Sequence, residues 1–190
     1  MNSRLELTLD KHAFLHWAER QEGRFELKGN RVVAIANGTR NHAHVFSNIA
    51  YALIRRLDRS CWSVTAANFA VAIGEDIRYP DVLVERAGAD GKALSTTEPV
   101  FIAEVLSPSS LALDLHDKAA EYMSLPSLEA CLVAAQDEPR LWLWQRAAAG
   151  ARAFPISPQE LSGTAARLTL KALGVEVELA EIYAGIAPLA

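Results

Sequence analysis

An apolar run with a single acidic residue inside it most constrains how this chain can fold. Residues 100–106 read Val-Phe-Ile-Ala-Glu-Val-Leu, a stretch of strand length in which only Glu104 is polar. A nearly continuous apolar run of this length is typical of a strand that is buried on both faces of its sheet. Such a strand requires a central sheet with other layers on both sides, and it places Glu104 in or near the interior.

Two acidic residues, Glu104 and Asp81, therefore need an explanation. Asp81 follows Pro80 inside a predicted strand over residues 77–84, and both residue types are unfavourable within strands. Taken singly, each carboxylate is most simply explained by a buried ion pair or a strand-end turn. Because the two strands are expected to be neighbours, the pair together favours a shared site. Two converging carboxylates suit Mg²⁺ or Mn²⁺, which prefer oxygen ligands.

The rest of the pattern predicts strands and helices that interleave without strict alternation. Glycine at position 29 predicts a hairpin over residues 24–35, and helical spacing of apolar residues predicts a helix over residues 41–59. Further strands are expected at 62–73, 130–135, 141–146 and 151–155, and further helices up to residue 20, from 107–110 to 125, and near 181–184. The expected fold class is α/β (α+β), a mixed central β-sheet, antiparallel at first, flanked by helices.

Composition limits the compartment and the partners. The chain has 190 residues, which suits one domain over residues 1–190, and a net charge of 19 − 23 = −4. That charge excludes a globally basic nucleic-acid binder but allows a local basic groove. The two cysteines form no CxxC motif, so a disulfide framework is not expected. With no long apolar run and no apolar leader, we expect a cytoplasmic protein without a membrane partner.

The helix expected after Glu104 carries an acidic and a basic residue at helical spacing. Asp114 and Lys118 are four residues apart, and this spacing alone favours a surface salt bridge. Tyr122 continues the same helix face, where ordinary packing is the simplest interpretation. The sequence contains no glycine-rich phosphate loop and no GxSxG nucleophile motif, so the usual cofactor and nucleophile chemistries are not indicated.

Four motifs along the chain match one known family. Residues 24–30 read RFELKGN, residues 42–45 read HAHV, residues 79–82 read YPDV, and residues 104–110 read EVLSPSS, followed by Asp114, Lys118 and Tyr122. Together these motifs, within a similarity that spans roughly residues 5–185, resemble the Uma2 family, also called DUF820, of the PD-(D/E)xK nuclease superfamily. The block from Glu104 to Tyr122 is the most specific of the four.

The resemblance implies a restriction-endonuclease-like fold and a metal-dependent endonuclease that hydrolyses DNA and leaves a 5′-phosphate. It implies that Asp81 and Glu104 hold Mg²⁺ or Mn²⁺, with the Val105 carbonyl as a further ligand. The superfamily lysine that positions or activates water is replaced by Leu106 in its usual place, so Lys118 on the following helix is the matching candidate.

The same resemblance implies further contributors around this trio. Glu26 would be an additional acidic residue at the rim of the site, and His42, Asp114 and Tyr122 would support it. A basic rim for DNA would draw on the following arginines: Arg24, Arg31, Arg40, Arg55, Arg56 and Arg78. Because superfamily members often dimerise to cut two strands, a homodimer is also expected.

Three functions are compatible with these residues. The first is the DNA endonuclease, which requires Asp81, Glu104 and Lys118 to converge within a few ångströms. The second is a catalytically inactive module for nucleic-acid binding or dimerisation, in which Lys118 would face solvent and pair only with Asp114. The third is a phosphodiesterase for a small nucleotide, which would have a narrow, closed pocket.

Overall fold

The computed structural model describes residues 7–35, 38–106, 114–148 and 151–186. Two β-sheets form most of the described structure. One sheet has five strands in the order β2-β1-β5-β4-β7, and the other has six in the order β11-β10-β9-β8-β6-β3, while β12 and β13 pair separately. The strands are β1 (Arg24–Lys28), β2 (Arg31–Ile35), β3 (Trp62–Ala66), β4 (Ala70–Ile73), β5 (Asp76–Arg78), β6 (Val82–Arg86), β7 (Ser95–Thr96), β8 (Phe101–Val105), β9 (Ala130–Ala134), β10 (Arg140–Gln145), β11 (Gln159–Ser162), β12 (Arg167–Leu170) and β13 (Val175–Glu178). The helices are α1 (Lys11–Ala18), α2 (Arg40–Arg56), α3 (Asp114–Met123) and α4 (Leu179–Ile182), with a short 3₁₀ turn at Lys171–Leu173.

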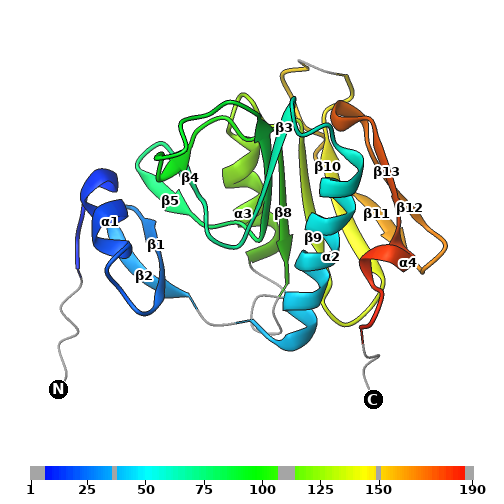
Figure 1. The fold of residues 1–190 in the computed structure, drawn as a ribbon, viewed down its shortest axis with the longest axis horizontal. Helices are drawn as coiled ribbons and strands as arrows, with labels where there is room; N and C mark the ends of the chain where they lie inside the picture. The colour runs from blue at the N-terminus through cyan, green and yellow to red at the C-terminus, as the bar shows by residue number, and fades with distance from the viewer. Residues whose placement is uncertain (1–6, 36–37, 107–113, 149–150, 187–190) are drawn as a thin grey trace.

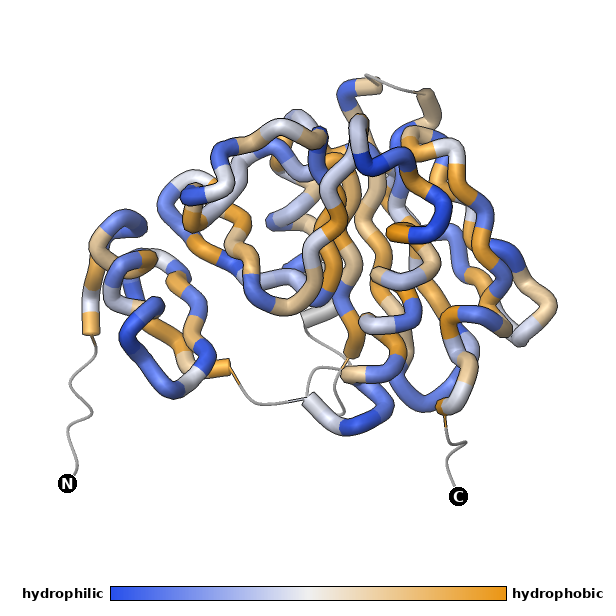
Figure 2. The backbone as a smooth tube through the Cα atoms, viewed as in Figure 1, coloured by the Kyte–Doolittle hydropathy of each residue, from blue (hydrophilic) through white to orange (hydrophobic). Residues whose placement is uncertain are grey.

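The strand predicted from the apolar run lies inside the six-stranded sheet. β8 runs antiparallel to β6 and parallel to β9, so the sheet is mixed, as predicted. Helix α2, the β12–β13 pair and α4 pack on one face of this sheet, and α3 packs on the other (Figure 1). Hydrophobic residues, drawn orange, recur along these central strands (Figure 2). The prediction of a strand covered on both faces is therefore confirmed.

Alternate side chains of β8 face the two covering layers, because successive residues of a strand point to opposite faces. Phe101, Ala103 and Val105 belong to the core cluster that contains α2. Ile102 belongs to the cluster that contains Tyr122 of α3. Glu104 therefore points towards α3.

The five-stranded sheet has its own core against α1. Phe14 of α1, Leu27 of β1 and Ile77 of β5 are fully buried in this cluster. The predicted hairpin is present, and its turn places both Gly29 and Asn30 at positive φ, 54° and 62°. Two successive residues at positive φ are typical of a type I′ turn, whose twist matches that of the flanking strands. This turn fixes the register of β1, the strand that carries Glu26.

The strands predicted over 62–73 and 77–84 are each interrupted. Ala67, at φ 67°, separates β3 from β4, and the segment containing Pro80 separates β5 from β6. These breaks let the chain pass between sheets, since β3 and β6 pair in the six-stranded sheet and β4 and β5 in the other. The predicted strand at 151–155 is wrong, because β10 pairs with β11 instead. The predicted helix caps at 107–110 lie outside the described residues.

No helix within the described ranges combines the length and apolar character that a bilayer crossing requires.

Candidate active site

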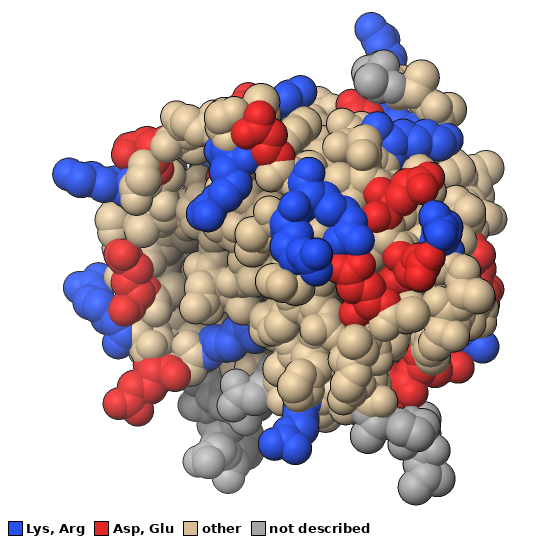
Figure 3. Space-filling model, turned by 45° about the vertical axis from the view of Figure 1, so that its right-hand side comes forward, with Lys and Arg blue, Asp and Glu red and all other residues tan. Residues whose placement is uncertain are grey.

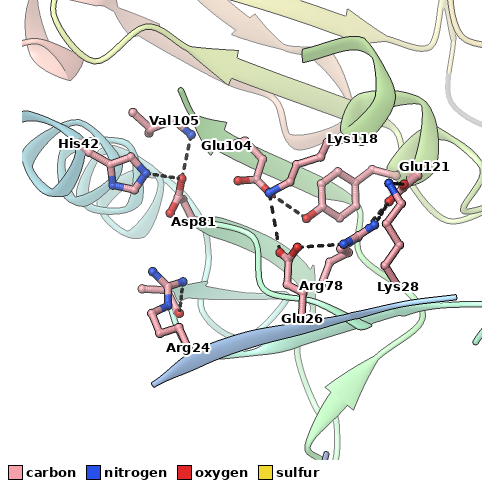
Figure 4. Close-up of polar contacts among 12 residues, drawn as sticks. Arg24, Glu26, Lys28, His42, Arg78, Asp81, Glu104, Val105, Lys118 and Glu121 are labelled. Atoms are coloured by element: carbon pink, nitrogen blue, oxygen red, sulfur yellow. Dashed lines mark hydrogen bonds and ion pairs between the residues drawn. The ribbon is translucent and has the colours of Figure 1, made fainter. Parts of the chain in front are cut away.

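The pairing of β6 with β8 brings the two conspicuous carboxylates together (Figure 4). Val82, the first residue of β6, lies opposite Ala103 of β8. Asp81 directly precedes Val82, and Glu104 directly follows Ala103, so the register puts both residues at the same end of the strand pair. The negative charge of Asp81 acts on Glu104 there. This proximity is the arrangement that a shared site requires.

Asp81 is held by donors from two directions. Its side chain is almost fully buried, with 4% of the residue exposed. The Val105 backbone N–H donates to Asp81 Oδ2 at 2.8 Å, and His42 Nε2 lies 3.1 Å from the same oxygen. Thr39 caps α2 by accepting from the His42 N–H, which sets where His42 enters the site. The Val105 N–H and His42 both contact Oδ2, and together they fix the orientation of the carboxylate. Oδ1 has no donor among the described residues.

Glu104 is held from the α3 side. The Tyr122 hydroxyl donates to Glu104 Oε1 at 2.7 Å. The pKa of Glu104 is raised to about 7, and burial of the side chain is the largest cause of this shift. The Lys118 ammonium opposes the shift, and the negative charge of Asp81 adds to it. Burial and the neighbouring Glu104 raise the pKa of Tyr122 well above its usual value, so the phenol remains a donor. Glu104 is thus a carboxylate that shares its surroundings with one cation, Lys118, and two anions, Asp81 and Glu26.

Lys118 faces a buried ion-pair cluster. Its Nζ lies 3.7 Å from Glu26 Oε1, and Glu26 Oε2 accepts from Arg78 Nη1 at 2.9 Å. Arg78 also donates from Nε and Nη2 to Glu121 Oε2, at 2.9 and 2.6 Å. Burial acts to lower the pKa of Arg78, but Glu26 and Glu121 outweigh it, and the pKa is raised. The guanidinium therefore stays charged and links β1 to α3.

Two expectations about the rim are corrected by this cluster. Glu26 and Arg78 were both expected at the rim, but only 5% and 4% of these residues are exposed. They are buried because α3 covers the polar face of β1 and β5, and their opposite charges compensate each other. Arg78 is therefore a structural cation of the site rather than part of a DNA-facing surface.

Three other predicted contributors lie elsewhere or outside the described part of the structure. Asp114 is the first residue of α3, but its side chain lies outside the described part of the structure, so its predicted pairing with Lys118 stays a prediction. Arg55 and Arg56 lie in the last turn of α2, where Arg56 Nη2 pairs with Glu181 Oε2 at 2.7 Å. Basic and acidic groups are mixed on that face of the molecule (Figure 3). The described side chains of that face form no continuous basic rim.

Sequence reasoning missed the part that Arg78 and Glu121 play. One signal was available, because Glu121 follows Lys118 by three residues and so shares its helix face. No comparable signal linked Arg78 to Glu121, since the two are 43 positions apart and meet only after the five-stranded sheet docks on α3.

The donor set fits a divalent cation. Asp81 and Glu104 each have one oxygen bound to a protein donor, and the second oxygen of each has no described donor. In a regular strand the N–H and C=O of one residue point to the same side, so the Val105 carbonyl is expected on the side of β8 where its N–H meets Asp81. Within the described ranges, no three His, Cys, Asp or Glu side chains gather as a metal site. Mg²⁺ commonly needs only one or two carboxylates, because water and substrate phosphates complete its shell.

The raised pKa of Glu104 predicts how the stability of the metal-free protein depends on pH. The pKa in the folded state is about 7, against an ordinary value of 4.5, so the folded state holds this proton more tightly. The resulting stabilisation is complete below pH 4.5 and is lost as pH rises through 7. Melting temperatures in EDTA between these pH values should fall more for the wild type than for Glu104→Gln. Parallel curves for the two proteins would contradict this prediction.

Comparisons with known proteins agree with this fold. A family model, Uma2, described as "Putative restriction endonuclease", matches residues 12–179. Two uncharacterized proteins of Synechocystis sp. are each 27% identical, one over 94% of this chain and 93% of its own length, the other over 63% and 71%. The crystal structure of "a putative nuclease belonging to DUF820" from Anabaena variabilis superposes with a TM-score of 0.74. It covers 92% of this chain and 97% of that one at 10% identity, which is a likeness of fold.

Proposed function

The chain belongs to the Uma2 family, and from this premise we propose that it is a metal-dependent endonuclease that hydrolyses phosphodiester bonds in DNA. The observation that carries the proposal is that Asp81, Glu104 and Lys118, from three separate segments, lie close enough at one end of β8 for the charges of Asp81 and Lys118 to shift the pKa of Glu104 (Figure 4). Two carboxylates, each with one oxygen that has no donor among the described residues, beside one ammonium group suit the hydrolysis of an anionic ester.

Asp81, Glu104 and the Val105 carbonyl would hold Mg²⁺ or Mn²⁺. When bound, such an ion polarises a phosphoryl oxygen and lowers the pKa of bound water. The chain prepares these ligands in advance, because His42 and the Val105 N–H fix Asp81, and the Tyr122 hydroxyl fixes Glu104. Preorganised ligands need little rearrangement when the substrate arrives.

Lys118 would act on the reacting phosphate. Hydrolysis forms a bond between a water oxygen and phosphorus and breaks the P–O3′ bond, which leaves a 5′-phosphate and a protonated 3′-hydroxyl. The Lys118 ammonium stabilises the negative charge that grows on the phosphoryl oxygens and orients the attacking water. Glu26, 3.7 Å away, directs the lysine towards this position, and Arg78 in turn holds Glu26.

A plasmid assay with a metal-binding measurement tests the proposal. Supercoiled plasmid should be nicked in Mg²⁺ or Mn²⁺ and remain intact in EDTA. Asp81→Asn should weaken Mn²⁺ binding by about tenfold or more, because an amide is a poorer ligand than a carboxylate for a hard cation. Glu98→Gln is the matched control, since Glu98 is an exposed carboxylate outside the site, and it should behave as the wild type.

The outcomes separate the three candidate functions. Metal-dependent nicking that Asp81→Asn abolishes supports the endonuclease. Mn²⁺ binding that depends on Asp81, without any nicking of DNA, would direct the search to small phosphodiesters. A protein that neither nicks nor binds Mn²⁺ would contradict the proposal and leave the non-catalytic module as the explanation.

A further inference from the structure

One face of β1 is polar and lines the candidate site. Phe25 and Leu27 pack in the cluster that contains α1, so Arg24, Glu26 and Lys28 point the other way. Arg24 lies on the Asp81 side of Glu26, and Lys28 lies on the opposite side (Figure 4). The site therefore has one basic side chain at each end of this strand face.

The two basic side chains differ in what they bind. Lys28 Nζ lies 3.3 Å from Glu121 Oε1, so a carboxylate compensates its charge. Arg24 instead donates from Nη2 to the neutral carbonyl of Ala67 at 3.3 Å, and among the described residues no carboxylate pairs with it. Arg24 is half-buried. A partly desolvated guanidinium without an anionic partner favours the binding of an anion.

The backbone at Ala67 holds Arg24 close to Asp81. Ala67 has a φ of 67°, a left-handed conformation that is unfavourable for a residue with a Cβ atom. In this conformation its N–H donates to the Asp81 carbonyl at 2.9 Å, while its own carbonyl accepts from Arg24. Backbone strain of this kind persists where the surrounding structure requires it, and it is frequent at functional sites. One residue thus connects Arg24 to the backbone of Asp81.

We propose that Arg24 binds a backbone phosphate of the DNA substrate adjacent to the bond that is cut, an inference that rests on the proposed function. The planar guanidinium presents paired N–H donors that match two phosphate oxygens. Arg24 and Glu26 are two residues apart on one strand, a separation of about 6.4–6.8 Å along its axis. The phosphate at Arg24 is therefore the neighbour of the one that reacts near Lys118.

Salt dependence of DNA binding tests this assignment. The probe is a fluorescein-labelled duplex of about 20 base pairs, whose anisotropy is followed in EDTA over a range of salt concentrations. Arg24→Gln should weaken binding about tenfold and reduce the slope of log affinity against log salt by about one. Arg24→Lys should retain the slope, because it keeps the charge, with a loss of affinity of only a few-fold. Arg152→Gln, which removes an exposed arginine with no described partner, should leave affinity and slope unchanged.

A structural role for Arg24 predicts different results. If Arg24 acted only through Ala67 on Asp81, Arg24→Gln would lose affinity for Mn²⁺ and leave the salt slope of DNA binding unchanged, and this outcome would overturn the inference. A wild type that binds and nicks DNA, with the same slope in Arg24→Gln, would refute the role of Arg24 and leave the proposed function standing. A wild type that neither binds nor nicks DNA would refute both.

Discussion

Replacing Lys118 by methionine is expected to slow plasmid nicking by about 10²–10³-fold while Mn²⁺ binding is retained. Methionine keeps much of the length and volume of lysine but carries no charge to offset the negative charge of the reacting phosphate. The predicted metal ligands, Asp81 and Glu104, keep their own protein donors in this variant. Loss of the cation should also raise the pKa of Glu104, since Lys118 normally lowers it. The rate is measured from the decay of supercoiled plasmid under single-turnover conditions.

Two further variants separate charge from position. Lys118→Arg keeps the positive charge but places it on a larger, planar guanidinium at a different position. The nicking rate should therefore still fall substantially. Lys171→Met removes an exposed lysine in the 3₁₀ turn and should nick at the wild-type rate. Nicking by Lys118→Met within threefold of the wild type would show that Lys118 takes no part in the reaction.

Arg78→Met should lower the free energy of unfolding by about 3–5 kcal/mol. The substitution removes the cation that holds Glu26 and Glu121 together inside the protein. Breaking one partner of a buried ion pair leaves an uncompensated buried charge, which costs more than the pair itself contributes. Urea denaturation followed by circular dichroism measures the loss. Arg152→Met, at an exposed position, should change stability by less than about 0.5 kcal/mol.

A double variant checks that the buried charge is the cause. Glu26→Gln combined with Arg78→Met removes the anion along with the cation, so the double variant should be more stable than Arg78→Met alone. The free energy of unfolding of the double variant is compared with that of Arg78→Met. If it is lower by as much as Glu26→Gln alone lowers that of the wild type, the two substitutions act independently. In that case the cluster would not be a coupled unit.

The centre of the fold was accessible from sequence because its determinants are local. The apolar run around Glu104 specifies a strand covered on both faces, and the glycine at position 29 specifies a hairpin. The proximity of Asp81 to Glu104 was expected for the same reason, since each carboxylate interrupts an otherwise strand-like segment. Lys118 was expected from the family resemblance, because its spacing alone favoured a surface pair with Asp114.

The remainder depends on contacts between residues far apart in the chain. The left-handed backbone at Ala67 carries no sequence signal, because glycine or asparagine is the usual residue there. Strand β1 pairs with β5 across about fifty intervening residues, so the division into two sheets is set by packing rather than by periodicity. The burial of Glu26 and Arg78 follows from that division and could not be read from either segment alone.

The buried ion-pair cluster of Glu26, Arg78, Lys118 and Glu121 also determines at what point during synthesis the candidate site can assemble. Glu26 leaves the ribosome early, Arg78 and Asp81 follow, and Lys118 and Glu121 emerge only after more than half of the chain has been made. Glu26 therefore has neither its guanidinium partner nor its lysine until α3 has docked between the sheets. A nascent or truncated chain that ends before α3 lacks part of the candidate site, so the proposed cleavage of nucleic acid would begin only once folding is complete.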